Sequence, residues 1–97
     1  MQRFIDKVVL ITGSTEGMGR AIALAFAKEG AIVVPTDVNA ELLAKTAKEV
    51  SELSGRPVDW FRMDVTKKDQ IAQTVKAVVD KYGRIDGVFN GQPSQMN

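Results

Sequence analysis

A glycine-rich stretch at residues 12–19 constrains this chain more than any other feature. It lies between an apolar, strand-like run at residues 7–11 and a helix-like run at residues 20–27. Its three glycines allow the backbone to turn sharply and to approach a ligand without an intervening Cβ. The turn would also direct the free N–H groups of the following helix at a bound group, where the helix dipole favours an anion. A strand, a glycine turn and a helix in this order predict a phosphate-binding site. Its residues are Thr12, Gly13, Ser14, Thr15, Glu16, Gly17, Met18 and Gly19.

The rest of the chain repeats this alternation of strand and helix. Apolar runs at residues 8–12, 31–36, 58–63 and 85–90 are typical of strands buried on both faces of a parallel sheet. Stretches of helical period separate them, and these begin at the glycine turn, at Asn39 and at Thr66. Right-handed crossovers between neighbouring strands then predict a three-layer α/β sandwich, with helices on both faces of the sheet.

Each expected helix carries boundary signals and a line of residues that would face the sheet. Asn39 is a good N-cap, and Thr66 with Asp69 three residues later is close to a capping box. Gly30 and Gly83 are placed to end the first and third helices. The expected lines are Ile22, Ala25, Phe26 and Glu29 in the first helix, Leu42, Thr46, Val50 and Leu53 in the second, and Ile71, Val75, Val78 and Tyr82 in the third.

Composition removes several classes of function. The 97 residues fit one domain, expected over residues 1–90, with a polar tail at 91–97. The chain has no cysteine and no histidine, which excludes disulfides and removes the commonest metal ligand and general base. A net charge of +1 gives no electrostatic case for nucleic acid or an anionic membrane. No apolar run approaches the roughly 20 residues of a membrane helix, and the start of the chain lacks the apolar core of a signal peptide, so we expect a cytoplasmic protein.

The glycine loop is spaced G-x-x-x-G-x-G, which differs from the G-x-G-x-x-G dinucleotide fingerprint and from a Walker A loop. Its alternative interpretation is an ordinary strand-to-helix turn. The position directly after the first strand favours a nucleotide site.

Asp37 ends the second strand, 24 residues after Gly13. A carboxylate there can accept hydrogen bonds from both hydroxyls of an adenosine ribose and would repel a 2′-phosphate. The alternative is an acidic residue that merely precedes the helix at Asn39. The acidic Glu16 in the loop and the neutral Val38 after Asp37 both favour NAD over NADP.

Asp64 and Val65 follow the third strand. Asp64 could accept a hydrogen bond from an adenine amino group while Val65 covers the ring. A turn residue at the start of a helix explains Asp64 equally well.

Taken together, these residues resemble the short-chain dehydrogenase/reductase family. The resemblance extends from about Asp6 to Asn90 and rests on the loop, on Asp37, on Asp64 with Val65, and on the segment at residues 82–86 that leads into the fourth strand. It implies the NAD-binding half of a Rossmann fold, with a four-stranded parallel sheet in the order 3-2-1-4. The loop would surround the pyrophosphate of NAD, Asp37 would hold the adenosine ribose, and Asp64 with Val65 would frame the adenine. Asn90 matches the first asparagine of the family's Asn-Asn-Ala-Gly segment.

The chain departs from the family pattern after Asn90, where Gly91-Gln92-Pro93 stands in place of Asn-Ala-Gly. The family's catalytic Ser, Tyr and Lys lie in more than a hundred further residues. The only tyrosine here is Tyr82, and Asp86 stands where the family's lysine would follow. We therefore expect a chain that binds NAD but is inactive alone. The alternatives are an active oxidoreductase once a missing C-terminal half or a partner chain completes it, and a non-enzymatic interaction module. The exposed fourth strand predicts a homo-oligomer.

Overall fold

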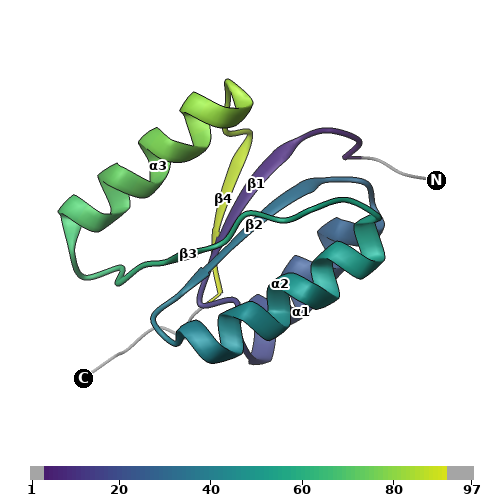
Figure 1. The fold of residues 1–97 in the computed structure, drawn as a ribbon, viewed down its shortest axis with the longest axis horizontal. Coiled ribbons are helices and arrows are strands. Elements are labelled where there is room, and N and C mark those ends of the chain that lie inside the picture. The colour runs from purple at the N-terminus through teal and green to yellow at the C-terminus, as the bar shows by residue number, and fades with distance from the viewer. Residues whose placement is uncertain (1–3, 92–97) are drawn as a thin grey trace.

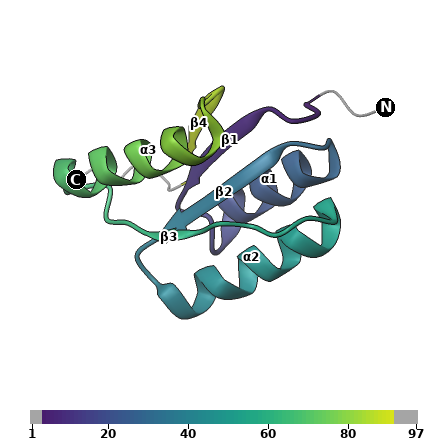
Figure 2. The same ribbon diagram turned by 45° about the horizontal axis from the view of Figure 1, so that its top comes forward.

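The computed structural model describes residues 4–91, which form alternating strands and helices. All strand pairs are parallel, in the order β3-β2-β1-β4, which confirms the predicted sheet. Helices α1 and α2 cover one face and α3 covers the other (Figures 1 and 2), as expected for a three-layer αβα fold. The elements are β1 (Val8–Thr12), α1 (Gly17–Lys28), β2 (Ile32–Asp37), α2 (Ala40–Ser54), β3 (Phe61–Arg62), α3 (Lys68–Tyr82) and β4 (Gly87–Asn90).

Strand β1 is the centre of the sheet, and every one of its residues is buried. Its side chains alternate between the two faces, as a strand requires. Val9 and Ile11 belong to the apolar cluster beneath α1 and α2, whereas Val8 and Leu10 belong to the cluster beneath α3. This two-sided burial explains the continuous apolar run in the sequence.

The outer strands are shorter than predicted. Strand β3 pairs with β2 only at Phe61 and Arg62, and the residues before it, from Val58 onward, lie outside the ladder. Strand β4 begins at Gly87 instead of residue 85, because the Asp86 carboxylate accepts the Val8 N–H at 2.7 Å and replaces a backbone acceptor. Apolar character alone does not distinguish a paired residue from one that packs beside the sheet.

The N-cap of α2 is confirmed, since Asn39 Oδ1 accepts the Leu42 N–H at 3.1 Å. The predicted start of α3 is wrong. The Thr66 hydroxyl donates to Asp64 Oδ1 at 2.6 Å, and the helix begins at Lys68 after an N-cap, Lys67, that makes no side-chain capping bond.

The predicted helix faces are correct in part. In α1 the buried residues are Gly19, Ala23 and Ala27, and in α2 Leu43 is fully buried while Leu53 is 43% exposed. In α1 the small residues face the sheet, and Ile22 and Phe26 of the predicted line are partly buried at its side. In α2 Thr46 and Val50 of the predicted line are buried. In α3 Val78 is buried as expected, together with Thr74.

Strand β4 is partly exposed on both of its faces. Val88 and Phe89 are 59% and 40% exposed. The ring of Phe26 in α1 lies 5.0 Å from that of Phe89 and 4.9 Å from that of Phe4, measured between centroids. These rings border a pocket of about 360 Å³ beside β4, which we call the β4 pocket.

Gly91 follows β4 and is buried, and the rest of the predicted tail, residues 92–97, lies outside the described residues. No helix within residues 4–91 is long and apolar enough to cross a membrane.

Candidate nucleotide-binding site

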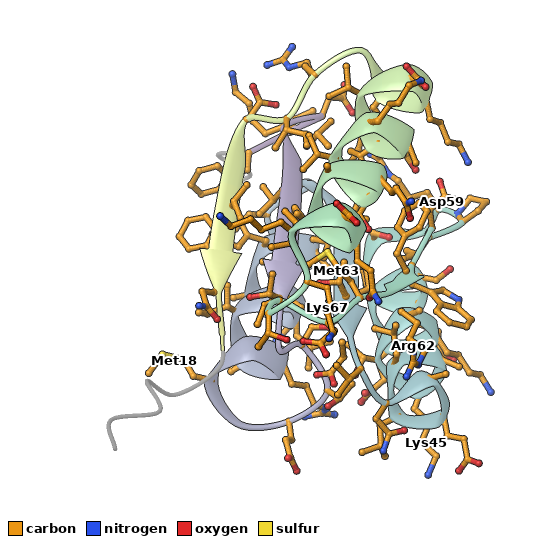
Figure 3. All side chains as sticks on the ribbon, turned by 90° about the vertical axis from the view of Figure 1, so that its left-hand side faces the viewer. Met18, Lys45, Asp59, Arg62, Met63 and Lys67 are labelled. Atoms are coloured by element: carbon orange, nitrogen blue, oxygen red, sulfur yellow. The ribbon has the colours of Figure 1, made fainter. Side chains whose placement is uncertain are left out.

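The candidate residues gather at one edge of the sheet because all four strands are parallel and their carboxyl ends meet there. Thr12, Asp37 and Asn90 are the last residues of β1, β2 and β4. In open α/β sheets this edge is where ligands bind. Figure 3 shows Met18, at the start of α1, extending away from the sheet at the lower left.

The glycine loop ends in a helix start with free donors. Gly13 and Gly17 have φ of 58° and 60°, which a residue with a side chain rarely adopts, and Glu16 is the N-cap of α1 without a side-chain capping bond. Within residues 4–91 no group accepts the N–H of Gly17, Met18 or Gly19. The first turn of α1 contains no acidic residue. These donors and the helix dipole therefore favour an anion.

Gly19 allows α1 to start in direct contact with the end of β1. A Cβ on Gly19 would lie 1.9 Å from the Gly13 oxygen, and a Cβ on Gly91 would lie 2.3 Å from Gly19 Cα. Gly91 also donates its N–H to the Thr12 oxygen at 2.8 Å. In the sequence Gly91 is only a departure from the family pattern, whereas in the structure it closes this contact. A glycine immediately after a strand, opposite two loop glycines, was the available signal.

Two polar side chains of the loop hold the strands together. The buried Ser14 hydroxyl donates to the Thr36 oxygen at 3.0 Å, across from β1 to β2. The Thr12 hydroxyl donates to Asn90 Oδ1 at 3.0 Å, across from β1 to β4. The Ser14 N–H also donates to the Thr36 oxygen, at 3.2 Å, so Ser14 and Thr12 fix the shape of the loop.

Asp37 lies against the loop, as its predicted role requires, and its side chain is almost completely buried. Oδ2 accepts the Thr15 N–H at 3.3 Å and the Thr15 hydroxyl at 2.9 Å. Oδ1 accepts the N–H of Val38 at 2.7 Å and of Asn39 at 3.2 Å. The link from Asp37 to Thr15 had no signal in the sequence. Glu16 and Val38 are both exposed next to this cluster.

Asp64 lies in the turn before α3, which is one of the two roles predicted for it. Oδ1 accepts the N–H of Thr66 at 2.9 Å as well as its hydroxyl, and these bonds hold the pKa of the Asp64 carboxyl below its usual value. Oδ2 accepts no hydrogen bond from residues 4–91. Val65 is half-buried beside it. An adenine contact through Oδ2 and Val65 stays a prediction.

Tyr82 lies at the opposite end of the sheet from the glycine loop, packed against the cluster that contains Val8. Its hydroxyl donates to Asp59 Oδ2. Burial and the Asp59 carboxylate raise its pKa to about 12. A tyrosine that transfers a proton near neutral pH needs the opposite shift.

Comparison with known proteins gives consistent matches. The model of a protein family described as short chain dehydrogenase matches residues 7–93. The 3-oxoacyl-[acyl-carrier-protein] reductase FabG of Thermotoga maritima is 47% identical over 88 residues, which are 91% of this chain and 35% of that protein. Levodione reductase of Leifsonia aquatica is 42% identical over 89 residues, which are 91% of this chain and 33% of that protein. This chain therefore spans about a third of the length of the curated relatives it matches.

Solved structures match equally well. NAD+-bound xylitol dehydrogenase superposes with a TM-score of 0.88 at 36% identity, over 96% of this chain and 35% of that one. A Shigella flexneri protein assigned to the short chain dehydrogenases and complexed with NADP superposes with a TM-score of 0.86 at 30% identity, over 96% of this chain and 40% of that one. Both forms of the cofactor thus occur among structures similar to this chain.

Proposed function

Because this chain belongs to the short chain dehydrogenase family, we propose that it is the NAD(H)-binding portion of an oxidoreductase of that family and does not turn over substrate alone. The observation that carries the proposal is the start of α1, where three backbone N–H groups have no acceptor within residues 4–91. The carboxylate of Asp37 lies against the same loop. The pyrophosphate of NAD fits the N–H groups, and its adenosine ribose fits Asp37.

The site residues support a division of roles along the cofactor. Residues 12–19 provide backbone donors and a surface without side chains where the glycines lie. Asp37 and Val38 lie where the ribose would extend, and Asp64 with Val65 lies beyond β3, where the adenine would follow. Asn90, bonded to Thr12, holds β4 next to the loop. When bound, NAD would supply the hydride chemistry, and these residues would bind and orient it.

The preference for NAD over NADP is part of the proposal. The 2′-phosphate of NADP would approach the Asp37 carboxylate, where Coulomb repulsion opposes it. Neither Glu16 nor Val38 offers a cation to compensate.

Inactivity of the chain alone is supported by the side chains that could act. The hydroxyl of Tyr82 is engaged by Asp59, far from the loop, with its pKa raised to about 12. Ser14, Ser51 and Ser54 donate to the backbone oxygens of Thr36, Arg56 and Ser51, and within residues 4–91 none of the three is bonded to a basic side chain. Ser94 lies outside the described residues.

Calorimetry with NAD and with NADP tests the proposal on the wild type and on Gly17→Val and Asp37→Ala. We expect weak NAD binding that falls at least about tenfold in each variant. Asp37→Ala removes charge-assisted hydrogen bonds, which contribute about 1.5–3 kcal/mol each. Gly17→Val distorts the helix start, because φ at this position is 60°. Asp37→Ala should reduce the difference in affinity between NAD and NADP. Equal heats for all three proteins would refute the cofactor site. Loss of NADH absorbance with a ketone, catalysed by this chain alone, would refute inactivity.

A second candidate function is a self-associating interaction module, favoured by the exposed edge of β4. Val88, Phe89 and the β4 pocket leave apolar surface in water, and an open strand edge can pair with another chain. Sedimentation at tens of micromolar should show a dimer that Val88→Lys converts to monomer. A monomeric wild type would exclude this candidate. A partner chain, or the remainder of a longer protein, that covers the same edge and restores turnover would support the active-enzyme alternative.

A further inference from the structure

We propose that the hydroxyl of Thr15 occupies, in the free protein, the place on Asp37 that a ribose hydroxyl takes in the complex. Thr15 is then an internal competitor that lowers the affinity for adenosine ribose. The inference rests on the proposed nucleotide-binding function and deepens it, because it assigns a role in ligand discrimination to a residue of the loop whose side chain had none.

The acceptor capacity of Asp37 is full in the free protein. A carboxylate offers about four lone-pair positions, and four donors occupy them: the N–H and hydroxyl of Thr15 on Oδ2, and the N–H groups of Val38 and Asn39 on Oδ1. Asp37 is also 9% exposed, so little of it remains open to a further donor. A ribose that donates two hydroxyls must displace at least one existing partner.

The Thr15 hydroxyl is the partner that can leave. Val38 and Asn39 follow Asp37 in the chain, and their N–H groups are held by the turn that starts α2. The hydroxyl of Thr15 moves away by a single rotation about χ1, between staggered positions.

Space for that rotation is present. Thr15 is half-buried and lines a pocket of about 500 Å³ between α1 and α2, which also reaches Arg20 and Lys45. A displaced hydroxyl can therefore find water there. Within residues 4–91 it makes no hydrogen bond other than the one to Asp37.

Thr15→Val removes the competitor and keeps the branched shape and the N–H bond. In this variant water occupies the vacated position on Asp37, and a ligand displaces water instead of a fixed donor. We expect the affinity for ADP to rise about 3- to 10-fold, the equivalent of one hydrogen bond of ordinary net strength. Thr15→Ser keeps the hydroxyl and should bind ADP as the wild type does.

The test compares ADP with 2′,3′-dideoxy-ADP, which has the same phosphates and base but no ribose hydroxyls. Dissociation constants come from NMR titration of the wild type, Thr15→Val and Thr15→Ser. Dideoxy-ADP should bind wild type and Thr15→Val equally, because it does not compete for Asp37. An unchanged or weaker ADP affinity in Thr15→Val, or an equal change for both ligands, would overturn the inference.

The wild type alone provides a second measurement if Thr15→Val does not fold. The amide proton of Thr15 should shift on addition of ADP, as its environment at Asp37 changes, and much less with dideoxy-ADP at equal saturation. Equal shifts with both ligands would again overturn the inference. Failure of the proposed function looks different, since the wild type would then bind neither ligand.

Discussion

Gly19→Ala tests the close contact at the glycine loop, because the effect of this contact on stability is opposite to that of helix propensity. Gly19 lies in the first turn of α1. Propensity alone predicts that Ala stabilises a helix by about 1 kcal/mol relative to Gly. The new Cβ would lie 1.9 Å from the oxygen and 2.7 Å from the carbonyl carbon of Gly13, both backbone atoms that cannot rotate aside. The helix start and the end of β1 must therefore move apart by more than an ångström.

The cost of that movement should exceed the propensity gain. Overpacking of a close contact costs about 1–3 kcal/mol, and contact with backbone on both sides favours the upper value. The net loss of unfolding free energy for Gly19→Ala is then about 2 kcal/mol. For a domain of this length such a loss lowers Tm by roughly 10 °C. The displaced Gly13 carbonyl should also weaken nucleotide binding.

Urea unfolding followed by circular dichroism measures the change, with Ala21→Gly as the matched control. Ala21 is exposed in the same helix, so Ala21→Gly should change stability through helix propensity alone. We expect it to lower the unfolding free energy by about 1 kcal/mol. Gly91→Ala introduces a Cβ 2.3 Å from Gly19 Cα and should destabilise as well. The double variant should lose less than the sum, because one displacement relieves both contacts. A Gly19→Ala variant as stable as the wild type, or more stable, would refute the argument.

Three further outcomes follow from the charges and hydrogen bonds of the described residues. The pKa of Tyr82 is raised from 10.0 to about 12, so the stability that its protonated hydroxyl contributes is complete below pH 10 and is lost as pH rises toward 12. In urea unfolding, the unfolding free energy of Tyr82→Phe should therefore fall less steeply than that of the wild type between pH 10 and 12. Parallel pH dependences for the two proteins would contradict this. Thr66→Ala should raise the depressed pKa of Asp64 toward 3.8, measured by carboxylate NMR titration, whereas an unchanged pKa would assign the shift elsewhere. The Arg20–Glu49 pair has side chains 42% and 38% exposed, so Glu49→Gln should cost less than about 1 kcal/mol in urea unfolding, and less still in 1 M salt; a larger cost would show a more rigid pair.

The sheet could be predicted from sequence because its central strands are defined by burial on both faces. Val8 to Thr12 has no exposed residue, and a run of that kind has few other structures available. The buried faces of the helices are harder to predict, because a large apolar residue is not always the one that packs against the sheet. Leu53 is large and apolar yet 43% exposed, while Ala23 and Ala27 are buried against the sheet. Sequence periodicity identifies the side of a helix to within about one residue and does not show which residue makes the closest contact.

Part of the candidate site could likewise be predicted from the sequence, and part could not. Asp37 and the glycines could be placed from spacing, since a strand end and a turn have local signatures. The bonds from Asp37 to Thr15, and from Thr12 to Asn90, join residues 22 and 78 positions apart. Such pairs depend on how the strands are ordered in the sheet. Strand order comes from the packing of the whole chain, so no local pattern could indicate them.

The residues of the glycine loop that shape the fold are the same ones that form the proposed cofactor site. Gly19 brings α1 into contact with Gly13 at the end of β1, and that contact aims the free N–H groups of the helix at the edge of the sheet. Gly91 must then also lack a side chain, because its Cα approaches Gly19 from β4. A side chain at position 91 would require the end of β4 and the start of α1 to move apart. The glycine at 91 therefore fits the close contact that α1 makes with the ends of β1 and β4 in this chain.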